Sequence, residues 1–230
     1  MAHMTSDEEK QEAAKRSLAF IKDGDVVGLG TGSTASHAIR FLGDRVRQGL
    51  KIVGIPTSVQ SRDLALKLGI PLTDFERSPN IDVTIDGADE INPALELIKG
   101  GGGALLREKI VASASRMVVI IADSGKQVSI LGKFPLPIEI IPFAEMLLIR
   151  RIEALGARAV LRKSPGGALF VTDEGHHILD CSFGTIPDPG KLAAELDRMP
   201  GVVEHGLFIG LAKIALIGKE IEIRASGAED

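Results

Sequence analysis

The chain has no tryptophan, no tyrosine and only eight phenylalanines among its 230 residues. Single-stranded nucleic acid is commonly bound by stacking its bases on aromatic side chains, so this composition argues against such a site. The formal net charge is −4 and no basic block occurs, which argues against nucleic acid as a partner. Hydrophobic residues still make up 44% of the chain, so its core must be built mainly from aliphatic side chains.

Cysteine and long apolar runs are equally scarce. Cys181 is the single cysteine, so the chain cannot form an internal disulfide, as is typical of proteins in a reducing cytosol. No apolar run approaches the roughly 18 residues of a membrane span, and no signal-peptide pattern opens the chain. We therefore expect a cytoplasmic protein with no membrane partner, in which Cys181 is a small buried hydrophobe rather than a reactive thiol.

Uniformly apolar segments alternate with helical segments in the first part of the chain. This alternation is typical of a parallel sheet covered by helices on both faces, and it predicts a Rossmann-like layer structure over residues 5–130. The predicted strands are 25–30, 51–55, 81–85, 95–98 and 117–122, and the predicted helices are 6–22, 33–48, 58–68 and 104–115.

The pattern changes after a proline-containing segment at 134–137. Shorter strands and two helices then predict a small α+β unit over about 131–205. The apolar tail at 206–218 is expected to return to the first sheet, which would make the small unit an insertion. The strands predicted for this unit are 138–141, 158–162, 168–172, 177–182 and 202–205, and its predicted helices are 143–155 and 192–198.

A glycine-rich segment at 28–34 lies where a predicted strand turns into a helix. Glycine allows a sharp turn and close approach to a ligand, and the first N–H groups of a helix favour an anion. The glycine spacing is not that of a dinucleotide fingerprint, and no Gly-Lys-Ser/Thr follows. We predict a site for a single phosphate, the alternative being a tight turn with capping hydroxyls. The predicted ligands are Thr31, Gly32, Ser33 and Thr34.

Two acidic residues, Asp86 and Asp89, follow a predicted strand at its carboxyl end, where open α/β sheets bind ligands. Asp-Gly is also a common turn dipeptide, so Asp86 alone would not distinguish a turn from a catalytic group. Neighbouring carboxylates suit acid–base chemistry. With Glu90 they could instead bind magnesium, but Lys99 could neutralise them without an ion, and we predict no metal site.

Lys99 precedes four consecutive glycines, which are costly to order and therefore need a reason. We predict a loop that offers backbone N–H groups to an oxyanion while Lys99 adds positive charge, the alternative being a solvated surface lysine. Glu108 lies on the next helix, and the residues three and four positions away from it are all apolar. This placement suits a general base in a partly dry pocket, or equally a solvated helix glutamate. Lys126 follows the next apolar strand and is placed to reach a phosphate.

These blocks, in this order, closely resemble the A-type ribose-5-phosphate isomerase family. The resemblance covers essentially all of residues 8–218, and it is specific because many blocks agree where any single one would be weak. The matching blocks are 30–34, 86–90, 98–102, 107–109, 122–123 with Lys126, 131–137 and, more weakly, 200–208.

The resemblance implies an aldose–ketose isomerase of the non-oxidative pentose phosphate pathway that interconverts D-ribose 5-phosphate and D-ribulose 5-phosphate. It implies an α/β fold in which a Rossmann-like parallel-sheet domain, residues 5–130 plus 206–230, carries an inserted ferredoxin-like α+β domain, residues 131–205. It further implies that the enzyme needs neither metal nor cofactor and forms a homodimer or homotetramer.

The same match suggests a role for each candidate residue. Glu108 would move a proton between C2 and C1 through a cis-enediolate, and Asp86 would assist ring opening. Asp89 and Lys99 would position the substrate and stabilise the oxyanion. The substrate contacts would come from Thr31, Gly32, Ser33, Thr34, Gly87, Ala88, Gly100, Gly101, Gly102 and Lys126.

Two alternatives stay open on the residues alone. One is a different enzyme on the same scaffold, such as a sugar-phosphate lactonase, an amino-sugar-phosphate deaminase or a CoA transferase with a glutamate nucleophile. The other is a non-catalytic sugar-phosphate sensor of a transcription regulator, which would leave the carboxylates and Lys99 without a role.

Overall fold

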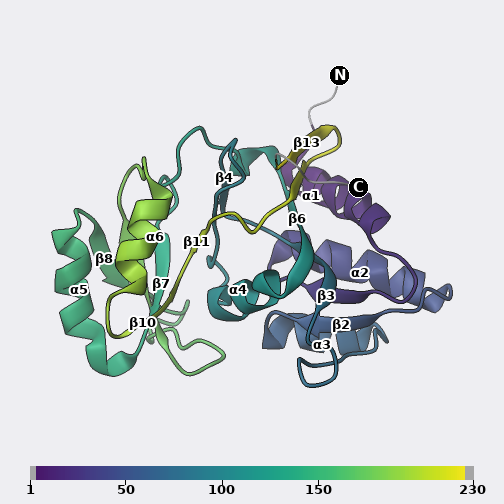
Figure 1. The fold of residues 1–230 in the computed structure, drawn as a ribbon, viewed down its shortest axis with the longest axis horizontal. Helices are drawn as coiled ribbons and strands as arrows, with labels where there is room; N and C mark the ends of the chain where they lie inside the picture. Colours follow the sequence, from purple (N-terminus) through teal and green to yellow (C-terminus); the bar gives the residue numbers. More distant parts are fainter. Residues whose placement is uncertain (1–3, 226–230) are drawn as a thin grey trace. The chain divides into compact units, whose positions relative to one another are not determined.

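The computed structural model describes residues 4–225, which divide into two compact units. One unit contains residues up to 88, 107–127 and those from 210, and the other contains 89–106 and 128–209. Figure 1 shows the course of the chain. Whether the predicted domains, 5–130 with 206–230 and 131–205, fold as independent bodies stays a prediction, and residues 226–230 lie outside the described part.

A six-stranded sheet forms the centre of the first unit (Figure 1). Its strands are β1 (Val26–Leu29), β2 (Val53–Pro56), β3 (Ile81–Asp86), β6 (Ser115–Ala122), β12 (Ile214–Ile217) and β13 (Ile221–Arg224). They follow the order β13-β12-β6-β3-β1-β2, and every neighbouring pair is parallel except the edge pair β12–β13. The predicted parallel α/β sheet is therefore confirmed, as is the return of the tail to it through β12. The strand predicted at 95–98 is not part of this sheet, because residues 97–98 pair with antiparallel strands of the second unit.

Helices cover this sheet because its strands are apolar on both faces. The helices and short 3₁₀ turns of the unit are α1 (Ser6–Ser17), η1 (Leu18–Phe20), α2 (Ser33–Arg47), α3 (Val59–Lys67), α4 (Leu105–Ser113, whose first two residues belong to the second unit) and η2 (Ser124–Lys126). Ile39 and Leu42 of α2 pack against Val83 and Ile85 of β3 in one aliphatic cluster. None of the helices within residues 4–225 has the length and apolar character that a membrane span requires.

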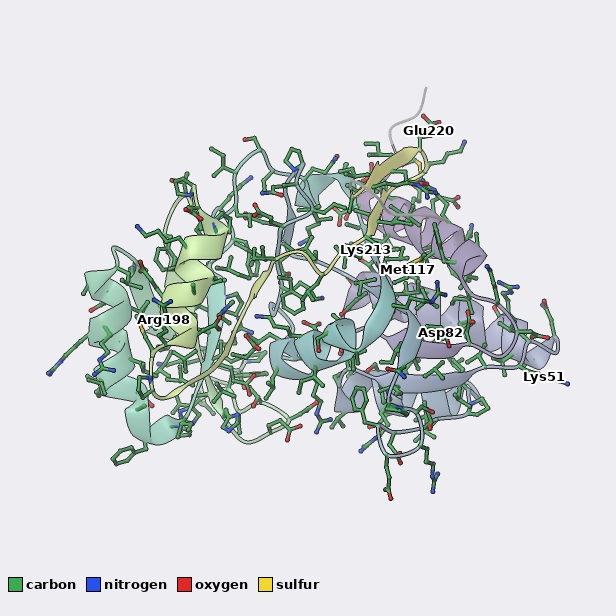
Figure 2. All side chains as sticks on the ribbon, viewed as in Figure 1. Lys51, Asp82, Met117, Arg198, Lys213 and Glu220 are labelled. Atoms are coloured by element: carbon green, nitrogen blue, oxygen red, sulfur yellow. The ribbon has the colours of Figure 1, made fainter. Side chains whose placement is uncertain are left out.

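The strand order defines where a ligand can bind. The sheet continues from β1 to β2 on one side and to β3 on the other, so the direction of winding reverses between β1 and β3. Ligands of open α/β sheets lie at such a switch point, outside the carboxyl ends of the strands. Asp86 ends β3 at this edge, whereas Asp82 and Met117, labelled in Figure 2, lie nearer the opposite, amino edge of β3 and β6.

The second unit contains two antiparallel sheets. Four strands pair in the order β10-β7-β9-β8, and three short strands pair in the order β11-β5-β4. The elements are β4 (Glu90–Ile91), β5 (Leu97–Ile98), β7 (Leu136–Ile140), η3 (Pro142–Ala144), α5 (Glu145–Ala154), β8 (Arg158–Leu161), β9 (His177–Ser182), α6 (Pro189–Asp197), β10 (Val202–His205) and β11 (Leu207–Phe208). The sequence β7-α5-β8-β9-α6-β10 is the ferredoxin-like arrangement, which confirms the predicted fold class.

Burial gives Cys181 the role expected of it. The side chain lies fully inside the core of the second unit, and this burial raises the pKa of its thiol well above the usual range, with a smaller contribution from the negative charge of Asp180. A thiol held in its neutral form is a poor nucleophile, so Cys181 acts as a small hydrophobe.

The strand predicted at 168–172 is wrong. Leu169 forms only an isolated bridge with Lys163, and the side chains of Leu169 and Val171 are exposed. The backbone N–H groups of this segment bond to separate places, Phe170 to the carbonyl of Arg162 and Thr172 to that of His176, so no continuous ladder forms. Its alternating apolar residues imitate a strand but have no core to face.

Candidate active site

The loop after β1 and the end of β3 are joined by backbone hydrogen bonds. Gly30 donates its N–H to the carbonyl of Ile85 (3.0 Å), and Thr31 donates its N–H to Oδ1 of Asp86 (3.0 Å). Gly32 then adopts a φ of +103°, a conformation that favours glycine, and α2 begins at the next residue. The first N–H groups of α2 therefore open at the same edge of the sheet as Asp86, as a phosphate site requires.

Asp86 is held firmly at this edge. Only 2% of the residue is exposed, and its Oδ1 accepts the N–H groups of both Thr31 and Gly87, the latter at 2.7 Å. The contact with Gly87 is the turn contact expected of an Asp-Gly pair, and the contact with Thr31 ties the same carboxylate to the neighbouring loop. The side chain of Asp86 therefore stabilises the turn and also links it to the loop after β1.

A group of buried hydroxyls supports the loop after β1. The hydroxyl of Thr31 lies 2.7 Å from that of Thr57 and 2.8 Å from that of Ser58, and all three side chains are buried. Sequence reasoning assigned no role in this site to Thr57 or Ser58, although both follow the carboxyl end of β2. Thr34 is buried beyond this group, whereas Ser33 is exposed at the start of α2.

Glu108 lies in the half of α4 nearer the carboxyl edge of the sheet. Ile81 at the start of β3 donates its N–H to the carbonyl of Ala114 (3.0 Å), which fixes the far end of α4 at the amino edge. Glu108 precedes Ala114 by six residues, or about 9 Å along a helix. Val111, one turn further on the same face, packs against Ile55 and Ile81. Glu108 itself is only 4% exposed, so it is not the solvated glutamate that the sequence left open.

Two lysines lie near the end of β6, together with the carboxylates of Asp123 and Glu9. Lys126 lies half-buried in η2, and Lys10 of α1 has its Nζ 4.0 Å from Oδ2 of Asp123. Asp123 also caps η2 by accepting the N–H of Gly125 (3.1 Å), and Glu9 of α1 accepts the N–H of Ser124 (2.7 Å). The segment that carries Lys126 is thus fixed by contacts with α1 and by its own cap at Asp123.

Lys99 belongs to the second unit and is buried, with 3% of the residue exposed. Its N–H donates to the carbonyl of Gly206 (2.9 Å), and its Nζ lies 5.4 Å from the centre of the Phe208 ring, within cation–π range. The alternative of a solvated surface lysine is therefore wrong. A buried ammonium group is costly unless it interacts with other groups, which is consistent with a functional position.

The glycine loop that follows is folded back on itself. Gly100 and Gly103 adopt φ values of +101° and +84°, and the N–H of Gly103 donates to the carbonyl of Gly100 (2.9 Å). The N–H of Gly101 donates to Oδ2 of Asp89 (2.7 Å). These two N–H groups are used within the unit, so fewer of them face a ligand than the sequence suggested. Gly102 is exposed, and its N–H has no hydrogen-bond partner among residues 4–225.

Glu90, by contrast, has a structural role as a hydrogen-bond acceptor for the backbone. The residue is 2% exposed, and its two carboxylate oxygens accept the N–H groups of Gly132 (2.7 Å) and Phe134 (2.5 Å). These bonds hold the 131–134 segment against β4, so Glu90 is already engaged as a structural acceptor. This weakens the alternative in which it completes a three-carboxylate magnesium site.

A Glu90→Gln variant is expected to lower the free energy of unfolding by about 1–3 kcal/mol, because the amide nitrogen would face one N–H donor and leave it unpaired. Urea denaturation measures the change. Glu220→Gln is the matched control, since Glu220 is exposed (labelled in Figure 2) and should shift stability by no more than about 0.5 kcal/mol. Equal stability of the two variants would contradict the structural role of Glu90.

One group of side chains in residues 4–225 is compact enough to share a metal ion, namely Asp197, Glu204 and His205. His205 accepts the N–H of Leu207 at Nδ1 (3.2 Å), so its Nε2 carries the proton and donates to Asp197 (3.1 Å). The histidine is thus engaged within the fold, and this group gives no reason to assign a metal. The expectation that the enzyme needs no metal stays a prediction.

The predicted residues are distributed over both units. Asp86, Gly87 and Ala88 belong to the first, and Asp89 begins the second directly after them in the chain. The others in the first unit are Thr31, Gly32, Ser33, Thr34, Glu108 and Lys126, and the others in the second are Lys99, Gly100, Gly101 and Gly102. The first unit brings together the loop after β1 and Asp86, and the second brings together Asp89 and the glycine loop.

This geometry defines an α/β protein of the Rossmann-like class, with the N-terminus of a helix and a buried carboxylate at one edge of its sheet. Comparison with known proteins identifies the family. The model of the ribose 5-phosphate isomerase A (phosphoriboisomerase A) family matches residues 53–222. The ribose-5-phosphate isomerase A of Nitrobacter hamburgensis is 54% identical over 227 residues, which cover 96% of this chain and 98% of that protein.

Solved structures agree over the same length. A D-ribose-5-phosphate isomerase in complex with phospho-erythronic acid has a TM-score of 0.93 and 39% identity, covering 96% of this chain and 100% of that one. Ribose 5-phosphate isomerase A of Methanocaldococcus jannaschii has a TM-score of 0.91 with the same identity and coverage. The chain belongs to the ribose 5-phosphate isomerase A family, and it is an isomerase.

Proposed function

We propose that this chain interconverts D-ribose 5-phosphate and D-ribulose 5-phosphate through a cis-enediolate, with Glu108 as the general base. The observation that carries the proposal is the position of Glu108, which is only 4% exposed. It lies in the half of α4 nearer the carboxyl edge of the sheet, and Asp86 and the loop after β1 lie at the same edge. A base in such surroundings is shielded from water and can act on a carbon-bound proton.

The proposed reaction begins with binding of the phosphate and opening of the sugar ring. The phosphate binds at the N-terminus of α2, where Gly32, Ser33 and Thr34 supply N–H groups, with Lys126 adding charge. Asp86 assists ring opening, which frees the C1 aldehyde. These steps fix the substrate before any carbon–hydrogen bond is broken, so that the base needs to act only on a positioned substrate.

Proton transfer then follows. Glu108 removes the proton from C2, and the electron pair moves so that negative charge collects on the C1 oxygen. Lys99 and the glycine loop stabilise this charge as an oxyanion site does. Glu108 returns the proton to C1, while Asp86 moves the proton of the C2 hydroxyl to the C1 oxygen, which yields the ketose with no net change in atoms or charge.

Incubation of the purified protein with D-ribose 5-phosphate in ²H₂O with EDTA tests the proposal. Over many turnovers, ribulose 5-phosphate carrying deuterium at C1 is expected to accumulate in NMR spectra, because the carboxyl proton on the shielded Glu108 exchanges with solvent in a fraction of the turnovers. Turnover without deuterium would contradict transfer through an exchanging base. Binding of the sugar phosphate without turnover would favour a sensor, and a requirement for CoA would favour a transferase.

We further propose that the chain forms a homodimer or homotetramer. The segment from η3 into the start of α5 supports this assembly, because Phe143 is fully exposed and its neighbours Ile141, Met146 and Leu147 are about half exposed. Contiguous apolar side chains on the surface of a protein commonly mark an interface.

A further inference from the structure

An arginine outside the recognised motifs, Arg162, forms hydrogen bonds to the glycine loop at residues 100–103, and both belong to the second unit. Arg162 follows β8, and its Nη1 donates to the carbonyl oxygens of Gly100 (2.8 Å) and Gly101 (3.1 Å). Its Nε donates to Oδ2 of Asp180 (2.9 Å), and its Nη2 donates to Oδ1 of the same residue. The guanidinium group therefore bridges a carboxylate on β9 and two successive peptide groups of the loop.

Phe170 completes this support. Its ring centre lies 5.8 Å from Cζ of Arg162, and a Cβ atom added to Gly103 would come within 2.3 Å of the ring. The backbone of Phe170 is fixed as well, because its N–H donates to the carbonyl of Arg162 (3.0 Å). The loop is thus held at residues 100 and 101 by hydrogen bonds and at 103 by close packing.

The hydrogen bonds from Arg162 to the two carbonyls also fix the direction of the N–H groups in the same peptide groups. In a planar trans peptide the C=O and the following N–H point in opposite directions. Arg162 holds the carbonyl of Gly100, and the N–H of Gly101 in that same peptide group donates to Asp89 (2.7 Å). Arg162 also holds the carbonyl of Gly101, which directs the N–H of exposed Gly102 away from the guanidinium group.

We infer that Arg162 is a positioning residue for the isomerase reaction, which orients the N–H of Gly102 as a donor to the developing oxyanion and keeps Asp89 in place. This inference rests on the proposed function of the glycine loop. A charged group that binds a carbonyl polarises its peptide group and strengthens the N–H on the other side. Arginine suits this role because its rigid fork serves Asp180 and the two carbonyls together, which a lysine cannot do.

Steady-state kinetics of Arg162→Met and Arg162→Lys test the inference, with Arg158→Met as the control. Arg158 lies on β8 but is exposed. We expect kcat of both Arg162 variants to fall about 10–100-fold, with KM for ribose 5-phosphate changing much less, because the oriented donor acts mainly on the transition state. Arg158→Met should match the parent. An unchanged kcat in Arg162→Met would overturn the inference.

Chemical rescue separates positioning from mere stability. In Arg162→Ala, millimolar guanidinium ion should restore several-fold of the lost kcat by occupying the site between Asp180 and the loop, without raising the unfolding temperature in proportion. Loss of activity that tracks loss of stability, with no rescue, would show a structural role only.

Amide hydrogen exchange provides a readout that does not depend on catalysis. The N–H of Gly101 should exchange several-fold faster in Arg162→Met than in the parent, because its bond to Asp89 loses support. Unchanged exchange would overturn the inference even if the proposed function holds. A parent that makes no ribulose 5-phosphate would contradict the proposed function instead, and the exchange result would still decide whether Arg162 orients the loop.

Discussion

A Glu108→Gln variant is expected to lose about 10²–10⁴-fold in kcat, the range typical of a removed general base. The substituted amide would keep the size of the side chain in its buried position but could not accept the C2 proton. The loss corresponds to roughly 3–5 kcal/mol of transition-state stabilisation. The rate of ribulose 5-phosphate formation from ribose 5-phosphate, compared between the parent and the variant, measures the loss in kcat.

Binding must be measured beside turnover. Phospho-erythronic acid, the ligand of a related isomerase structure, carries a phosphate and a carboxylate but no aldehyde or ketone that could be isomerised, so it is a suitable binding probe. Its dissociation constant should change little in Glu108→Gln, since the variant retains the loop after β1 and Lys99. Glu76→Gln is the matched control, because Glu76 is exposed in the same unit. Near-normal turnover of Glu108→Gln would refute its role as base.

The parts of the site that sequence reasoning predicted share a physical signal. Asp86 follows an apolar strand, and the glycines at 28–34 follow another, so the rule that ligands bind at carboxyl ends locates both. The structure joins them through the N–H of Thr31. The core was equally predictable, because strands buried on both faces must be uniformly apolar.

Two features that the sequence did not reveal, the structural role of Glu90 and the contacts of Arg162, involve backbone partners. Glu90 binds N–H groups more than forty positions along the chain, at Gly132 and Phe134, and Arg162 binds carbonyls some sixty positions away. Every residue except proline has an N–H and every residue has a carbonyl, so a backbone partner leaves no mark in the sequence. A carboxylate beside a catalytic motif therefore cannot be assigned to chemistry or to structure without the fold.

A Gly30→Ala variant is expected to lose at least about 10²-fold in kcat/KM, because a small displacement of a catalytic group is enough for such a loss. A Cβ atom on residue 30 would lie 2.3 Å from Oδ1 and 2.6 Å from Cα of Asp86. The side chain cannot simply turn away, since Oδ1 is held by the N–H groups of Thr31 and Gly87 and the contact extends to the backbone. Asp86 must therefore move. Overpacking should also lower the free energy of unfolding by about 1–3 kcal/mol.

Two glycine controls separate these effects. Gly166→Ala should leave both stability and activity near the parent values, because nothing lies within 4 Å of its added methyl group. Gly28→Ala should destabilise the same strand, since its Cβ would lie 1.9 Å from Oγ1 of Thr84 and 2.8 Å from Cγ1 of Val111, and the three atoms nearest to it belong to these two residues and not to Asp86. If folded Gly28→Ala keeps most of its specific activity while folded Gly30→Ala loses it, the position of Asp86 limits the reaction. Equal losses in the two variants would attribute the effect to the strand and remove the case for a precisely placed carboxylate at this edge.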